Sequence, residues 1–197
     1  MSSSEARLDP AARGMLLRIA ADSIRTGLRE GHASEPRLED LPEPLRLPTA
    51  CFVTLHHHDQ LRGCIGSLEA RAPLAQNVAD NAFNAAFRDP RFPELTAPEL
   101  ADLELDISVL GTPCALQFSS EADLVTQLRP REDGLILEAG GRRGTFLPSV
   151  WESLPGPGDF LRHLKQKAGL PMDFWSDEVR VMRYGTESFS ARFVDVE

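Results

Sequence analysis

The chain has 197 residues, of which 42% are hydrophobic and 26% are charged, and its formal net charge at pH 7 is -9. This length and hydrophobic content predict one compact domain with a sizeable core. The negative charge argues against a nucleic acid partner and against an anionic membrane surface, because both need a concentrated basic face.

Nothing near the N-terminus has the pattern of a signal peptide, and no segment approaches the roughly twenty apolar residues of a transmembrane helix. We therefore expect a cytoplasmic protein. The cysteines at positions 51, 64 and 114 are odd in number and form no CxxC pair. They predict free thiols rather than a disulfide framework or a structural zinc site.

The N-terminal half begins with residues 1–9, which we expect to form a disordered tail before a domain spanning residues 10–197. Pro10 suits the first turn of a helix with Asp9 as its N-cap, and the apolar spacing continues to Gly31. A proline-rich surface connection is expected up to residue 48.

Two apolar runs, 49–55 and 61–68, predict a β-hairpin whose loop is the five-residue polar segment 56–60 (HHHDQ). A helical pattern then starts after Pro73 and is expected to end near Arg88.

The C-terminal half contains further strand and helix patterns. In chain order we expect a strand at 103–110, extended by or paired with 114–118, a helix at 121–128, a hairpin over 135–147 that turns at Gly140-Gly141, a helix at 160–168, and a closing pair of strands at 179–184 and 188–194. The hairpins predict a mainly antiparallel sheet with flanking helices, which is an α+β fold.

The segment Leu61–Gly66 (LRGCIG) carries the most unusual chemistry of the chain. Alternation along a strand puts Arg62 and Cys64 on one face, where the guanidinium would favour a nucleophilic thiolate. Gly63 and Gly66 inside a strand indicate that another group, such as a ligand, approaches the backbone closely. The alternative is that Cys64 is a small core residue, the glycines make room for the following helix, and Arg62 points to solvent.

The turn Phe87–Phe92 (FRDPRF) is the second candidate. Arg88 and Arg91 can bind an anionic group as bidentate forks. Equally, Asp89 can pair with one of these arginines and fasten the turn.

Polar residues on the preceding helix and on one strand are further candidates. Asn81, with Asn77 and Asn84, either binds a ligand or belongs to a solvated face. Asp106 lies in an apolar run, where it either faces the polar side of the sheet or is partly buried with an arginine.

The three consecutive histidines, His56, His57 and His58, are of a type that binds divalent metals. They fall in the expected hairpin loop with Asp59 as the nearby carboxylate, and we expect no metal site there. HExxH, Walker and GxGxxG motifs do not occur, so the sequence identifies no cofactor.

Taken together, the motifs resemble the AMMECR family, named for a human chromosomal region linked to Alport syndrome, midface hypoplasia and elliptocytosis. The hexapeptide LRGCIG is the hallmark of that family, and its prokaryotic members are called protein A of the AmmeMemoRadiSam system. Further similar segments are FVTL (52–55), AAFRDPRF (85–92), ISVL (107–110), DGLIL (133–137), GTFLPSVW (144–151), FLRHLKQKAGL (160–170) and RYGTESF (183–189).

The resemblance implies a two-lobed α+β fold with a smaller second lobe and with the hallmark segment near a cleft. It also implies association with a Memo-type protein and a radical S-adenosylmethionine protein, and it provides no settled activity. The matching hallmark positions are Arg62, Gly63, Cys64, Ile65 and Gly66, together with Asp89, Pro90, Arg91 and Phe92.

Two functions remain open from the sequence. The first is a binding component that presents the LRGCIG face to a ligand or a partner protein. The alternative is an enzyme that uses Cys64 as a nucleophile on a small anionic substrate, with Arg62 lowering the pKa of the thiol. We favour the binding component, because the sequence places no general base beside Cys64.

Overall fold

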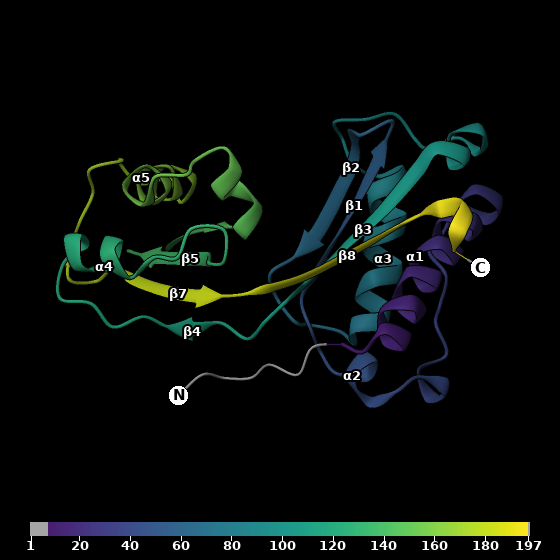
Figure 1. Cartoon of the computed structure of the whole chain (residues 1–197), viewed down its shortest axis with the longest axis horizontal. Coiled ribbons are helices and arrows are strands. Elements are labelled where there is room, and N and C mark those ends of the chain that lie inside the picture. The colour runs from purple at the N-terminus through teal and green to yellow at the C-terminus, as the bar shows by residue number, and fades with distance from the viewer. Residues whose placement is uncertain (1–7, 197) are drawn as a thin grey trace. The chain divides into compact units, whose positions relative to one another are not determined.

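The computed structural model describes residues 8–196 and divides the chain into two compact units. The first unit runs up to Leu110 and includes the C-terminal segment from Glu187, while the second comprises Gly111–Thr186. Each unit contains one four-stranded antiparallel sheet. Helices accompany both sheets (Figure 1). The expected α+β class is confirmed.

The first helix, α1 (Pro10–Glu30), begins and ends where its capping residues predict. Asp9 Oδ1 accepts the backbone N–H of Ala12 at 2.7 Å, and Gly31 ends the helix in the left-handed region with φ of 77°. Residues 1–7 of the expected tail lie outside the described residues. For residues 8 and 9 that expectation is wrong, because Leu8 is buried in the core.

The strands of the first sheet lie in the order β2-β1-β3-β8, so β2 is at one edge. Helices α1 and α3 pack against each other and cover one face of this sheet (Figure 1). The elements of this unit besides α1 are η1 (Leu38–Asp40), α2 (Glu43–Arg46), β1 (Cys51–His57), β2 (Gln60–Ser67), α3 (Leu74–Phe87), η2 (Ala97–Asp102), β3 (Leu103–Leu110), β8 (Thr186–Arg192) and η4 (Phe193–Asp195).

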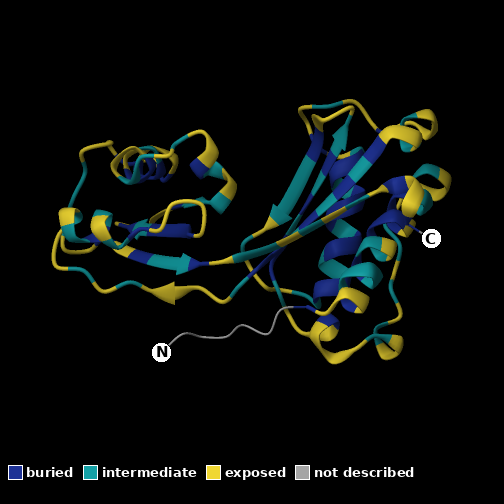
Figure 2. Ribbon diagram, viewed as in Figure 1, coloured by how far each residue is buried: buried dark blue, intermediate teal, exposed yellow. Residues whose placement is uncertain are grey.

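Burial alternates along the strands of the first sheet. On β1, Cys51, Val53 and Leu55 are fully buried under the helices, whereas the residues between them are partly exposed (Figure 2). This period of two gives the sheet a core face and a second face that the helices leave uncovered. We call the second face the open face. Its residues include Phe52, Thr54, His56, Cys64, Asp106, Ser108 and Ser188.

The expected five-residue loop at 56–60 is wrong. His57 pairs with Gln60, so the turn contains only His58 and Asp59, whose φ angles are 51° and 60°. Two successive left-handed residues make the tight turn that matches strand twist, normally with asparagine or glycine. The sequence lacks that signal, and the strands therefore extend further than it predicts.

The second unit has the strand order β4-β7-β5-β6 and a separate core. In that core Trp151 stacks on Phe160 with ring centroids 3.7 Å apart. The Gly140-Gly141 turn is confirmed, with φ angles of 55° and 74°. Its elements are β4 (Cys114–Ala115), α4 (Glu121–Gln127), β5 (Gly134–Ala139), β6 (Arg142–Phe146), η3 (Pro148–Glu152), α5 (Pro157–Lys167) and β7 (Arg180–Tyr184).

Two expected pairings are wrong. The segment at 114–118 neither extends nor pairs with β3, because β4 pairs with β7 in the second sheet. The closing strands also do not pair with each other, since β7 lies beside β5 and β8 lies beside β3. A single residue, Gly185, separates them, and a hairpin needs a loop of at least about two residues.

No helix among the described residues is both long enough and apolar enough to cross a membrane.

Helix α3 approaches the edge strand β2 at Gly63. A Cβ atom on Gly63 would lie 2.1 Å from the backbone carbonyl oxygen of Ala85. Since that oxygen belongs to the helix backbone, it cannot move aside without shifting α3. Gly63 is thus required for the packing of the helix on the sheet.

We predict that Gly63→Ala lowers the free energy of unfolding by about 1–3 kcal/mol or more, because the added methyl overpacks a backbone contact. The matched control is Gly14→Ala in α1, where a Cβ meets nothing within 4 Å. That variant should be neutral or slightly stabilising, because alanine is the better helix former. Urea unfolding of both variants checks this, and equal stabilities would contradict the packing argument.

Candidate functional site

The LRGCIG segment lies in the edge strand β2, and its cysteine faces the neighbouring strand across the open face. Cys64 is opposite Thr54 of β1, and the Thr54 Oγ1 atom donates a hydrogen bond to the Cys64 sulfur at 3.2 Å. The thiol is partly exposed. The strand therefore presents a cysteine with one hydroxyl donor at its sulfur.

Arg62 lies at a β-bulge, where Leu55 pairs with Gly63 but the next residue, His56, pairs with Leu61. This extra residue breaks the alternation from which we predicted a shared face for Arg62 and Cys64, so the premise of that prediction is wrong.

The Arg62 guanidinium binds Glu99 of η2 instead, with Nε 2.7 Å from Oε1. Arg62 is largely buried, and its hydrogen bond lowers the pKa of Glu99 to about 2. Glu99 also completes a capping box with Thr96 at the start of η2. Arg62 thus fastens β2 to η2, and the alternative in which it points to solvent is also wrong.

Asp89 binds the backbone of Cys64. The Cys64 N–H donates to Asp89 Oδ2 at 2.9 Å, while Arg91 Nη2 donates to the Cys64 carbonyl oxygen at 3.2 Å. Arg91 also pairs with Asp89, at 2.6 Å between Nη2 and Oδ2. The turn after α3 therefore satisfies both outward-facing backbone groups of an edge-strand residue, where a further strand would otherwise pair.

The Asp89 carboxylate is almost completely buried, with 2% of its side chain exposed. The hydrogen bonds from Arg91 lower its pKa, and the Cys64 N–H adds to this effect against the opposing effect of burial. The predicted alternative in which Asp89 pairs with an arginine and fastens the turn matches this arrangement. The guanidinium of Arg91 is engaged by a carboxylate of the protein itself.

Neighbouring protein atoms occupy the space that a side chain would take at Gly63 and Gly66. Gly63 is covered by Ala85 on the core face, and a Cβ on Gly66 would lie 2.4 Å from the ring of Phe52. The prediction that a ligand uses these positions to approach the backbone does not fit this packing, because the space above each Cα is occupied.

The other predicted residues contact groups other than the Cys64 thiol. The Asn81 amide is buried and donates to the carbonyl oxygen and the sulfur of Cys51, at 3.2 and 3.4 Å. Burial raises the pKa of Cys51 to about 12. Ile65 packs against the first core, and the exposed Arg88 lies over the ring of Phe83 at 4.9 Å. The Asn81 amide is therefore hydrogen-bonded within the protein.

Asp106 continues the row that Cys64 begins. Thr54 is paired with Cys64 on one side and with Asp106 of β3 on the other, so the three residues cross the open face in line. Burial raises the pKa of Asp106. Ser108 Oγ lies 3.4 Å from Asp106 Oδ1 and 2.8 Å from Ser188 Oγ on β8.

Cys64 and Asp106 are candidates from the sequence alone, whereas Thr54, Ser108 and Ser188 are not. The period-two patterns of 49–55 and 103–110 show which residues share a face, although they do not show that β1 and β3 are neighbours. Only the strand register aligns these side chains.

The second unit contains a cavity of about 560 Å³, lined by parts of the segments 115–119 and 175–182. None of the residues singled out from the sequence lines it. Its chemistry is mixed, with Phe118 and Trp175 beside Glu138 and Arg180.

Comparison with known proteins agrees with the fold and with the family resemblance. The family model described as AMMECR1 matches residues 17–189. A protein from Methanothermobacter thermautotrophicus is 39% identical over 180 residues, covering 88% of this chain and 91% of its own length. A protein from Thermotoga maritima is 38% identical, covering 84% of this chain and 91% of its own.

A solved structure is also similar to this chain. It is the crystal structure of the uncharacterized protein PH0010 from Pyrococcus horikoshii, with a TM-score of 0.83 and 31% sequence identity. The match covers 93% of both chains.

We predict that Asp89→Asn lowers the free energy of unfolding by about 2–3 kcal/mol, because charge-assisted hydrogen bonds to Arg91 are lost. It should also speed hydrogen exchange at the Cys64 N–H. The matched control is Asp195→Asn, which removes a similar two-bond pair with Arg192 at the surface. We expect no measurable change there.

The contribution of Asp89 to the free energy of unfolding should decrease at low pH. Because the pKa of Asp89 is below the ordinary value of 3.8, its contribution is complete above about pH 5 and is lost as the pH falls through the acid range below 3.8. The stability difference between wild type and Asp89→Asn should therefore shrink at low pH. A difference independent of pH would contradict the role of the ion pair.

Proposed function

This chain belongs to the AMMECR1 family, and we propose that it is a binding component that uses the open face of its first sheet, centred on Cys64, to act with a Memo-type protein and a radical S-adenosylmethionine protein. The observation that carries the proposal is the row of Cys64, Thr54 and Asp106, which lies partly exposed across three paired strands.

The backbone beneath this row is held rigidly. Asp89 and Arg91 bind both backbone groups of Cys64, and Arg62 ties the same strand to Glu99. Rigid strands lose little conformational entropy on binding, so a ligand meets a surface that needs little ordering. This arrangement suits recognition by fixed hydrogen-bonding groups.

The chemistry of the row favours an uncharged polar group over an anion. With the neighbouring Ser108 and Ser188, it offers a thiol, hydroxyls and a carboxyl group whose pKa burial raises. The two arginines of the hallmark motifs, Arg62 and Arg91, each pair with a carboxylate of the protein. An amide, such as a peptide backbone, matches donors and acceptors of this kind.

A Cys64 nucleophile remains the second candidate, favoured by the partial exposure of its thiol and by the Thr54 hydroxyl at 3.2 Å. A hydroxyl donor stabilises a thiolate. Asp106 is two strands away, which corresponds to about 10 Å at the usual strand spacing, whereas a general base must lie at about 3 Å. For Asp106 as the base, this distance favours binding over catalysis.

The proposal is tested by measuring complex formation with the Memo-type and radical S-adenosylmethionine proteins of the same genome. We predict that Ser188→Arg, which places a long cation on the open face, weakens binding at least tenfold. Ser149→Arg changes an exposed serine of the second unit and should bind as wild type does. Unchanged binding by Ser188→Arg would sink the proposal.

Cysteine labelling separates the two candidates. In a binding component, Cys64 should react with iodoacetamide at neutral pH no faster than the exposed Cys114, and buried Cys51 should stay unmodified in the folded protein. Peptide mass spectrometry measures the three rates. Labelling of Cys64 well ahead of Cys114, together with loss of function in Cys64→Ser, would favour the enzyme.

A further inference from the structure

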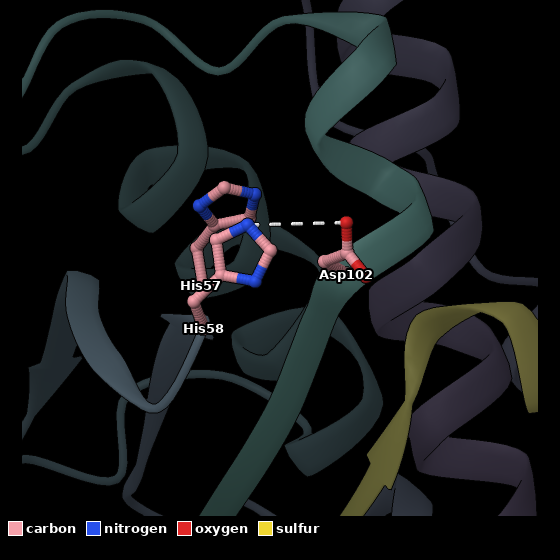
Figure 3. A group of neighbouring side chains, drawn as sticks. All are labelled: His57, His58 and Asp102. Atoms are coloured by element: carbon pink, nitrogen blue, oxygen red, sulfur yellow. Dashed lines mark ion pairs between the residues drawn. The ribbon is translucent and has the colours of Figure 1, made fainter.

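The tip of the β1–β2 hairpin brings together two histidines and one carboxylate. One nitrogen from each of His57 and His58 and one oxygen of Asp102 all lie within 4.8 Å of one another. Figure 3 shows the two imidazole rings side by side, with the Asp102 carboxylate across from them. The ring centroids are 4.1 Å apart.

The tight turn is what aligns the two rings. Consecutive side chains in a strand normally point to opposite faces. His58 has φ of 51°, in the left-handed region, which redirects its side chain relative to that of His57. The sequence predicts a five-residue loop for these histidines and no metal site, and the loop prediction is wrong because His57 pairs with Gln60.

The carboxylate is delivered by the neighbouring strand. His57 is paired with Leu103, the first residue of β3, so Asp102 at the end of η2 lies beside the hairpin tip. Asp102 Oδ2 is 3.9 Å from His58 Nε2. The helix η2 is itself fastened to β2 by the Arg62–Glu99 ion pair, so the position of Asp102 is defined.

We propose that His57, His58 and Asp102 form a binding site for a divalent transition metal ion such as Zn²⁺. Imidazole nitrogens favour zinc, copper, nickel and cobalt, whereas magnesium and calcium prefer oxygen ligands. Two histidines with one carboxylate also form a known zinc ligand set that leaves one position open.

The geometry needs only small adjustments to bind the ion. Bonds of about 2.0–2.2 Å in a tetrahedron place ligand atoms about 3.4 Å apart. The side chains of His58 and Asp102 are 67% and 59% exposed, so they rotate freely enough to close from the present separations. Without a metal, a surface pair of this kind contributes little to stability.

The test is calorimetric titration of untagged, chelator-treated protein with ZnCl₂, together with the visible absorption of the Co²⁺ form. We expect one ion per chain, and His58→Ala and Asp102→Asn should each weaken binding at least about tenfold. Imidazole nitrogen NMR signals of His57 and His58 should shift on addition of Zn²⁺.

Matched controls define the site. His32→Ala removes a surface histidine that pairs with a single carboxylate, Glu30, and His163→Ala removes one in the second unit. Cys114→Ser removes an exposed thiol, and all three variants should bind as wild type does. Lack of saturable binding, or undiminished binding by Asp102→Asn, overturns the proposal. Loss of binding in His56→Ala with Asp102→Asn unaffected also overturns it, because the histidine run alone would then hold the ion.

Discussion

The first unit depends on the interactions of the buried Asp89 carboxylate with Cys64 and Arg91. It accepts the backbone N–H of Cys64 and pairs with Arg91, which in turn binds the Cys64 carbonyl oxygen. An edge strand leaves such groups unpaired and open to another strand. Here the turn that follows α3 takes the place of that strand, so the end of the helix and the edge of the sheet are held together.

This interaction changes the interpretation of the LRGCIG and FRDPRF segments. Arginine, aspartate, cysteine and glycine within two short segments suggest a catalytic or anion-binding site. In the structure Arg62, Arg91 and Asp89 are engaged within the protein, and Gly63 admits the backbone of α3. The two segments mainly hold the edge strand β2 in place. The Cys64 thiol lies on the open face.

The Arg62–Glu99 ion pair extends the same frame to the hairpin tip. It joins the edge strand to η2, and η2 leads directly into β3 and ends with Asp102. The open face and the group of His57, His58 and Asp102 are thus supported by one set of contacts, although they carry different chemistry. The hydrogen bond from Arg62 that defines the position of η2 also lowers the pKa of the Glu99 carboxyl group, against the opposing effect of burial.

Local signals in the sequence determined the helices, the strands and the turns with their usual residues. Asp9 and Gly31 cap α1, Gly140-Gly141 turns the β5–β6 hairpin, and alternation marks the core face of β1. The sequence did not reveal the left-handed turn at His58 and Asp59, because neither residue is glycine or asparagine.

Tertiary structure alone decided which side chains meet. Asp89 reaches Cys64 across 25 residues and Arg62 reaches Glu99 across 37, and the row of Cys64, Thr54 and Asp106 requires the order of three strands. Periodicity and capping report the conformation of neighbouring residues, whereas strand order and ion pairing depend on how distant segments share burial and charge. For that reason the sequence identified the fold class and the cysteine, and the structure assigned the surrounding residues their roles.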